Sequence, residues 1–274
     1  MFYTRVTTAL ILAISFLFLL FFLSEIFFKI SIGLILFFSF WEWLSLIRIR
    51  FLTQILISFA FIFLIIFSFF ALNQIFIMKL SLVLSSIIWF FIFIIITFFP
   101  HRIKVLALTS SNFTIFSAIF LLFSAWQGFL FLYGQEGGQY LFLFLIVIVC
   151  ASDIGAYLIG RLFGKIKLAE KISPGKTWEG FFSGLVFSII FSNIYLNIFS
   201  ENFNLSTHLN LSLVILLISI VSVIGDLFIS LLKRRYGKKD TGNLLPGHGG
   251  ILDRVDGLIP ALTVLPLILV FVNG

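Results

Sequence analysis

Cysteine and charged residues are scarce in this chain. Its 274 residues include one cysteine, Cys150, which excludes an intrachain disulfide and gives no sign of a disulfide-bonded scaffold. Charged residues make up 11% of the sequence against 61% hydrophobic residues, and the mean hydropathy is +1.23. Because soluble globular proteins lie far from these values, that class is excluded. The composition predicts an all-α polytopic integral membrane protein.

Apolar runs recur along the whole sequence at the length that a membrane helix needs, about 20 residues. They predict about nine transmembrane helices, namely Thr7–Leu23, Lys29–Ile47, Phe51–Leu72, Leu80–Pro100, Val105–Leu132, Tyr140–Gly160, Gly180–Ser200, Leu211–Leu232 and Leu258–Val272. No small-residue cleavage site follows the first run, so it is interpreted as a membrane helix and not as a signal peptide. No internal repeat is visible.

Basic residues divide unequally between the two sides that these helices define. With a cytoplasmic N-terminus, all of the 18 Lys and Arg residues except Lys29 and Lys79 lie on the cytoplasmic side, as the positive-inside rule requires. This topology explains the pI near 9.7, so nucleic-acid binding is not expected. The chain divides into N-terminal helices over 1–104 and a C-terminal region over 105–274, with cytoplasmic loops at 161–179 and 233–257. Trp41 and Trp43 around Glu42 indicate an aromatic anchor at the inner boundary.

Two aspartates lie inside predicted helices, just below the polar loops. Asp153 and Asp226 each come seven residues before a loop, which places them roughly 10 Å below it. A carboxylate at that depth is costly unless it is paired, bound to a metal or open to water, and it therefore indicates a functional site. Asp226 shares one helical face with Ser222, Ser230 and Lys233. The structural alternative is a salt bridge between Asp226 and Lys233, or between helices.

Asp253 and Asp256 stand three residues apart at the start of the last helix. Two carboxylates so close repel each other unless a cation lies between them, and Mg²⁺ commonly binds through one or two carboxylates plus substrate phosphates. Donors for anions surround them in the sequence: Lys233, Arg234, Lys238, Lys239, His248 and Arg254. The segment predicts a site for a metal and phosphates.

The segment Ser173–Thr177, SPGKT, ends like a P-loop but fails as one. Glu170 stands where the Walker A spacing needs a glycine, and no strand is expected before it. Ser173, Lys176 and Thr177 still lie at a predicted loop-to-helix junction, where backbone amides and a lysine favour a phosphate. The alternative is a plain interfacial loop.

The polar segments carry a family resemblance. Ser230-x-x-Lys233-Arg234, Lys239-Asp240-x-Gly242 and Pro246-x-His248-Gly249-Gly250-x-x-Asp253-Arg254-x-Asp256 together resemble the signature of the phosphatidate cytidylyltransferases, or CDP-diacylglycerol synthases. Similarity extends to Asp153-x-x-Ala156-Tyr157, Phe163-Gly164-Lys165 and Ser173-Pro174-x-Lys176-Thr177-Trp178-Glu179-Gly180, so it covers about the C-terminal half. Gly175 departs from the family pattern, in which a lysine is common.

The resemblance implies a reaction in which CTP and phosphatidate give CDP-diacylglycerol and pyrophosphate. It implies Mg²⁺, with a second cation left open, a homodimer, and a site on the cytoplasmic side of a bacterial inner membrane. By analogy, the metal ligands are Asp226, Asp253 and Asp256, with Asp153 as a further candidate, and Lys233 joins them as a catalytic group. The same analogy assigns substrate phosphates to Ser173, Lys176, Thr177, Arg234, His248 and Arg254.

Two other functions stay open from the sequence. A CTP-dependent lipid kinase would transfer the terminal phosphate and release CDP, and it would need a base to activate a hydroxyl. A cation-coupled transporter would explain intramembrane aspartates, although transporters commonly show repeated halves and midplane sites.

Overall fold

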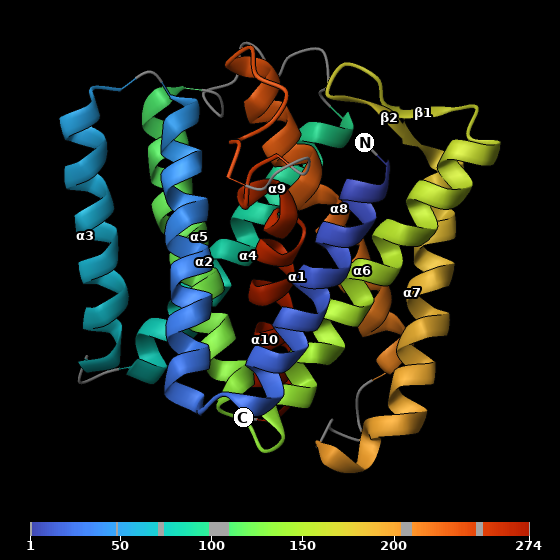
Figure 1. Cartoon of the computed structure of the whole chain (residues 1–274), viewed down its shortest axis with the longest axis horizontal. Coiled ribbons are helices and arrows are strands. Elements are labelled where there is room, and N and C mark those ends of the chain that lie inside the picture. The colour runs from blue at the N-terminus through green and yellow to red at the C-terminus, as the bar shows by residue number, and fades with distance from the viewer. Residues whose placement is uncertain are drawn as a thin grey trace.

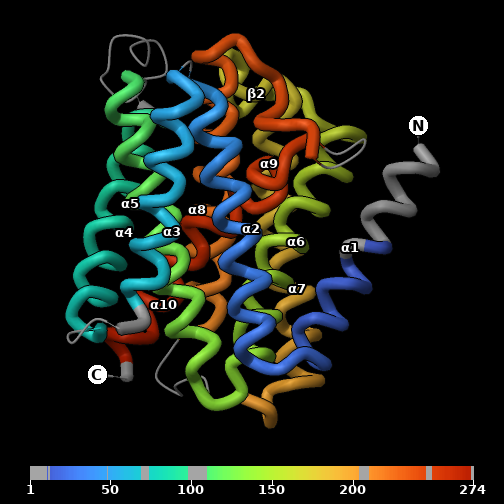
Figure 2. Tube along the Cα trace, turned by 60° about the vertical axis from the view of Figure 1, so that its left-hand side comes forward, coloured from blue at the N-terminus to red at the C-terminus, as the bar shows by residue number. Residues whose placement is uncertain are grey.

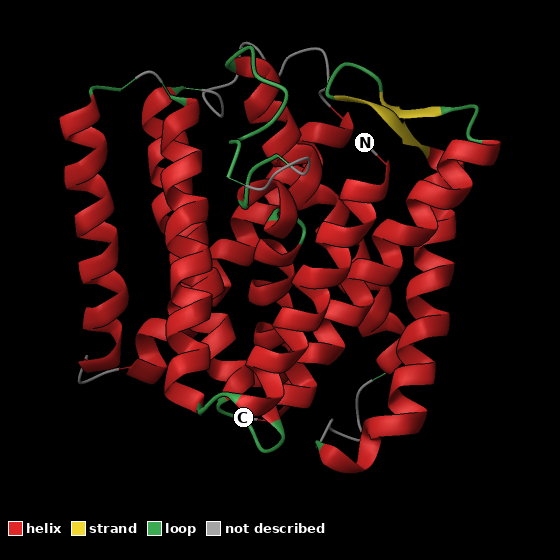
Figure 3. Cartoon of the chain, viewed as in Figure 1, coloured by secondary structure: helices red, strands yellow, loops and turns green. Residues whose placement is uncertain are grey.

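The protein is a bundle of long helices. The computed structural model describes residues 2–47, 49–70, 74–98, 110–203, 210–244 and 249–273, and most of these are helical (Figure 3). The helices are α1 (Phe2–Phe22), α2 (Glu25–Leu46), α3 (Phe51–Phe70), α4 (Gln74–Phe98), α5 (Ser111–Tyr133), α6 (Gly138–Phe163), α7 (Trp178–Phe199), α8 (Leu211–Arg235), α9 (Leu252–Val255) and α10 (Leu258–Asn273). A 3₁₀ turn, Ser200–Asn202, follows α7. The predicted all-α polytopic class is confirmed.

The predicted membrane spans coincide with helices. Within the described chain, eight helices are long and apolar enough to cross a membrane, one of them combining α9 and α10 as Leu252–Val272. The span predicted as Thr7–Leu23 lies along α1, in which Ala13–Phe22 forms a shorter apolar stretch.

Four helix starts differ by four or more residues from the sequence-based boundaries, and two of these, α1 at Phe2 instead of Thr7 and α4 at Gln74 instead of Leu80, are earlier extensions of the predicted spans. α2 begins at Glu25 instead of Lys29, because the ion pair between Lys29 and Glu25, at 2.5 Å, spans the first turn and supports a helix on polar residues. α5 begins after Ser110, whose side chain accepts a hydrogen bond from the Phe113 amide and caps the helix. The part of that predicted span over residues 105–109 lies outside the described residues.

The cytoplasmic loop predicted at 161–179 contains a β-hairpin that the sequence did not predict. Strands β1 (Lys167–Ala169) and β2 (Ser173–Thr177) pair antiparallel, with Lys167 opposite Thr177. Strands this short show too little alternation for a pattern to emerge. SPGKT is therefore an extended strand, which supports its rejection as a P-loop. The expectation that no strand precedes it was wrong, because β1 comes before it.

Helices α6 and α7 run side by side below the hairpin (Figure 1). A Cβ atom at Gly180 would lie 2.7 Å from the Ala156 carbonyl oxygen, so only glycine permits this approach. Ser183 Oγ also donates to the Gly155 carbonyl at 2.9 Å. The close contact holds the C-terminal end of the hairpin against α6.

Helix α8 is largely buried in the bundle. Its Phe228 ring packs edge-on against Trp43 of α2 and Trp89 of α4, with centroids 6.1 and 5.8 Å away. The end of α8, the hairpin and the described residues between α8 and α9 (236–244 and 249–251), which we call the α8–α9 loop, lie at the same end of the bundle. Helices α2 and α4 begin at the other end (Figures 1 and 2). The two predicted polar loops therefore share one face of the molecule.

Candidate active site

A polar cavity of about 620 Å³ lies between α6, the hairpin, α7 and α8. Its size is typical of small-molecule sites. Its lining includes five of the residues predicted from sequence, which come from three separate elements: Asp153, Ser173, Lys176, Thr177 and Asp226. The structure thus brings the first polar segment together with the intramembrane aspartates.

Asp226 is held from two sides. Lys176 of β2 approaches it with its Nζ atom 2.6 Å from Oδ2, and Ser230 donates to Oδ1 at 3.2 Å. The bond from Ser230 confirms that the two residues share a face of α8. The structural alternative of an Asp226–Lys233 salt bridge is replaced by a pair between α8 and the hairpin.

Lys176 remains a cation in this setting. Burial disfavours its charged form, but attraction to Asp226 and the hydrogen bond between them outweigh burial, and Asp153 and Asp256 add further attraction. The pKa of Lys176 is therefore raised above its ordinary value of 10.5. A fixed positive charge stands at the wall of the cavity.

Three carboxylates gather around that charge. Asp153, Asp226 and Asp256 act electrostatically on one another, although they come from α6, α8 and the start of the last span. No group of three or more acidic, histidine or cysteine side chains in the described part of the chain is arranged to hold a metal ion. The neighbouring pair Asp226 and Asp256 supplies the one or two carboxylates that Mg²⁺ commonly takes together with substrate phosphates. The residues fit that ion, and its binding stays a prediction.

Asp253 has a different environment from Asp256. Its Oδ1 atom lies 2.7 Å from Lys233 Nζ, and its Oδ2 atom accepts hydrogen bonds from the Thr241 and Gly250 amides at 2.9 and 3.1 Å. Both charged side chains are nearly buried, at 11% exposure for Lys233 and 8% for Asp253. Asp253 thus joins Lys233 to the α8–α9 loop, whereas Asp256 is close enough to Asp226 for the two carboxylates to interact electrostatically. The assignment of Asp253 to a shared metal stays a prediction.

The remaining predicted residues are placed as follows. Thr177 Oγ1 accepts a hydrogen bond from the Gly180 amide at 3.1 Å and caps α7, which confirms the predicted helix start, although a strand and not a loop precedes it. Arg234 Nε donates to the Ile172 carbonyl at 3.4 Å and ties the end of α8 to the hairpin. Arg254 is exposed beside the site. His248 lies outside the described residues.

Glu42 of α2 is not among the site residues predicted from the sequence. The neighbouring tryptophans predict an aromatic anchor around it, whereas the structure buries Glu42 to 3% exposure against the α8–α9 loop. An acidic residue within an apolar helix is the only signal that could have drawn attention to it. Nothing in the spacing connects position 42 with a loop some two hundred residues later.

Comparison with known proteins identifies the family of the chain. Residues 3–272 match the model of the "Cytidylyltransferase family". A Haemophilus influenzae protein named phosphatidate cytidylyltransferase is 32% identical over 94% of this chain and 95% of its own. Proteins of the same name from Pseudomonas aeruginosa and Staphylococcus epidermidis are 50% and 40% identical, and these matches span 55% and 63% of the relatives' lengths. The match across nearly all of the sequence shows that this chain belongs to the cytidylyltransferase family.

Proposed function

We propose that this protein transfers the cytidylyl group of CTP to phosphatidate and so forms CDP-diacylglycerol and pyrophosphate. The observation that carries the proposal is the Lys176–Asp226 pair in a polar cavity that adjoins an apolar one. The names of the relatives and the family membership support the same reaction.

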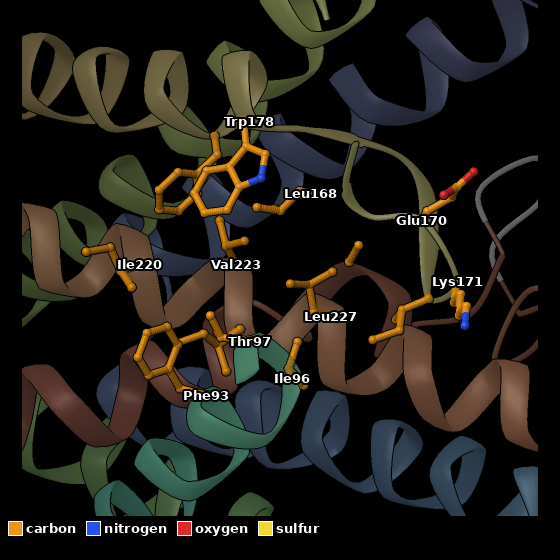
Figure 4. Close-up of a pocket in the computed structure, with 14 residues that line it drawn as sticks. Phe93, Ile96, Thr97, Leu168, Glu170, Lys171, Trp178, Ile220, Val223 and Leu227 are labelled. Carbon is orange, nitrogen blue, oxygen red and sulfur yellow. The ribbon is translucent and has the colours of Figure 1, made fainter. Parts of the chain in front are cut away.

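The apolar cavity suits the lipid part of phosphatidate. It has a volume of about 450 Å³, and Figure 4 shows Phe93, Trp178 and Ile220 directed into it, with Glu170 and Lys171 at one edge. Leu168, Phe181 and Val223 line both cavities, so the two are neighbours. A lipid phosphate in the polar cavity would have its acyl chains within reach of an apolar surface.

The polar cavity suits the reacting phosphates. A phosphate oxygen of phosphatidate attacks the α-phosphorus of CTP, the bond between the α-phosphorus and its bridging oxygen breaks, and pyrophosphate departs. Because the nucleophile is already an anion, the reaction needs no strong base, and the obstacle is repulsion between two polyanions. Lys176 is positioned to lower that repulsion, and Ser173 and Thr177 add hydroxyl groups beside it.

We propose Mg²⁺ as a cofactor that Asp226 and Asp256 hold, with Asp253 and Asp153 as further candidate ligands. When bound, it supplies positive charge to the phosphate oxygens. Lys233 lies close enough to attract both Asp226 and Asp256. This lysine therefore balances part of the carboxylate charge in the site.

We also propose how the protein is oriented in the membrane and that it forms a homodimer. The hairpin and the α8–α9 loop would face the cytoplasm, where CTP is present, in the inner membrane of a bacterium. The distribution of basic residues supports this orientation. A homodimer is proposed from the family resemblance.

An assay with purified protein in detergent tests the reaction. Dioleoyl phosphatidate and Mg²⁺ are supplied with CTP labelled separately at the α and γ phosphates. The α label is expected in the lipid and the γ label in pyrophosphate. Transfer of the γ label to an added lipid alcohol would favour the kinase, and no CTP-dependent transfer by folded protein would favour the transporter.

Two matched lysine variants test whether the reaction takes place in the polar cavity. Lys176→Gln removes the cation beside Asp226, whereas Lys29→Gln removes a lysine that is also paired with an acid, Glu25, but at the other end of the bundle. Transfer is expected to be lost in Lys176→Gln and kept in Lys29→Gln. Equal activity in the two variants would exclude the cavity as the reaction site.

A further inference from the structure

Glu42 is a buried carboxylate whose position the reaction does not explain. It lies in the last two turns of α2 at 3% exposure, flanked by Trp41 and Trp43. Burying a carboxylate is costly unless hydrogen bonds or a cation compensate for the lost water. Its partners therefore indicate why the helix contains an acid at this position.

The partners of Glu42 are in the α8–α9 loop and at the start of α9. Its Oε2 atom accepts hydrogen bonds from Thr241 Oγ1 at 3.1 Å and from the Leu252 amide at 2.8 Å. A Cβ atom added at Gly242 or at Gly250 would collide with the carboxylate. The loop backbone is thus folded directly around this one side chain.

The same loop residues continue into the site. The Thr241 amide donates to Asp253 at 2.9 Å, and Gly250, which touches Glu42, donates to the same carboxylate oxygen at 3.1 Å. Asp253 in turn pairs with Lys233 at 2.7 Å. A short chain of contacts therefore runs from Glu42 through the loop to Lys233, beside Asp226 and Asp256.

Only one oxygen of Glu42 takes part in these bonds. Oε1 is buried and has no hydrogen-bond partner among the residues that the structure describes. Both donors meet Oε2, so the contacts need one acceptor oxygen and do not by themselves need a negative charge. A glutamine could present its carbonyl oxygen to the same two donors, whereas an alanine would leave both donors buried and unpaired.

We propose that Glu42 is a positioning residue of this enzyme: its carboxylate oxygen holds Thr241 and Leu252 so that the α8–α9 loop keeps Asp253 and Lys233 in place for the phosphates of the substrates. The proposal rests on the proposed function for its kinetic consequence. It assigns to α2, in the N-terminal half of the chain, a direct part in ordering the C-terminal site.

The test compares Glu42→Ala and Glu42→Gln in the full-length protein in detergent, with Glu25→Ala as the matched control. Glu25 is also a glutamate of α2, but it is exposed and pairs with Lys29 at the opposite end of the helix. Two quantities are measured: the rate of trypsin cleavage after Lys238 and Lys239 in the loop, and kcat and KM for CTP.

Glu42→Ala is expected to speed cleavage in the loop and to lower kcat/KM for CTP by roughly tenfold or more, because two buried donors lose their acceptor. Glu42→Gln is expected to stay within about threefold of the wild type in both measurements, since it keeps the acceptor. Glu25→Ala should match the wild type. Rescue by glutamine separates positioning of the loop from a general need for a charge at position 42.

Two outcomes would overturn the proposal. Wild-type cleavage and kinetics in Glu42→Ala would show that the loop does not depend on this residue. Equal impairment in Glu42→Gln and Glu42→Ala would show that an acceptor oxygen at this position is not sufficient to hold the loop. If the wild type lacks transferase activity, the proposed function fails, while the cleavage rates still decide whether Glu42 holds the loop.

Should Glu42→Ala fail to insert or fold, Thr241→Val tests the same contact from the loop. Thr241 is buried, and valine removes its hydroxyl donor while the bond from the Leu252 amide to Glu42 remains. Trypsin should cleave the loop of Thr241→Val faster than that of the wild type, but the increase should be smaller than for the loss of both hydrogen bonds to Glu42. An unchanged rate would contradict the proposed contact.

Discussion

Replacing Lys233 is expected to be far more damaging than replacing Lys239, although both belong to the same basic segment. The Lys233 side chain is only 11% exposed, and its Nζ atom lies 2.7 Å from an Asp253 carboxylate that is itself nearly buried. Lys239 is exposed in the α8–α9 loop. Lys233→Gln therefore leaves a buried negative charge without its cation, and Lys239→Gln does not.

The expected magnitude follows from burial. Removing one partner of a buried ion pair typically costs about 3–5 kcal/mol, and an exposed substitution stays within about 0.5 kcal/mol. Lys233 is also one of the charges that attract Asp226 and Asp256, so its loss adds repulsion in the site. Lys233→Gln should lower both stability and transfer strongly, whereas Lys239→Gln should change stability little.

A double variant separates the two effects. In Lys233→Gln with Asp253→Asn, the asparagine oxygen can still accept from the Thr241 and Gly250 amides, and its amide group can donate to the new glutamine. No buried charge is left unpaired. Thermal unfolding in detergent should therefore show the double variant to be more stable than Lys233→Gln alone, while transfer of labelled CTP stays low in both.

Two results would contradict this role of Lys233. A double variant no more stable than Lys233→Gln would mean that the uncompensated charge on Asp253 is not the source of the instability. A loss of transfer in Lys239→Gln equal to that in Lys233→Gln would mean that the lysine required for transfer does not lie at the end of α8.

Three further predictions concern the carboxylates, the pH and the cation. Asp256→Asn should abolish transfer while the protein remains inserted and folded, and near-normal activity of the purified variant would remove Asp256 from the proposed metal site. Because the pKa of Lys176 is raised above 10.5, the stability that its charged form provides is present below that value and is lost only as the pH rises through the folded pKa. The difference in thermal stability between the wild type and Lys176→Gln should therefore stay constant from about pH 7 to about pH 9, and a difference that shrinks within that range would contradict the pairing with Asp226. Chelation with EDTA should stop transfer and added Mg²⁺ should restore it, whereas full activity of chelated protein would exclude the divalent cation.

The sequence alone determined the class of the protein and most of its helices. Hydropathy is a local property, because each membrane helix satisfies its own backbone hydrogen bonds and needs only an apolar run of sufficient length. This is why predicted spans such as Phe51–Leu72 and Leu211–Leu232 match α3 and α8 closely. The family signature around Asp253 and Asp256 could also be recognised from the sequence, because its residues are close together in the chain.

The tertiary structure alone decided which charges meet. Helical spacing correctly placed Ser230 beside Asp226, but it offered Lys233 as the partner of Asp226, whereas Lys176 of the hairpin takes that position and Lys233 pairs with Asp253. The burial of Glu42 against a loop from the other end of the chain is a contact of the same kind. Such pairs depend on how helices pack and where loops fold back. Packing brings together residues whose separation along the chain carries no periodic signal, so no pattern in the sequence could reveal them.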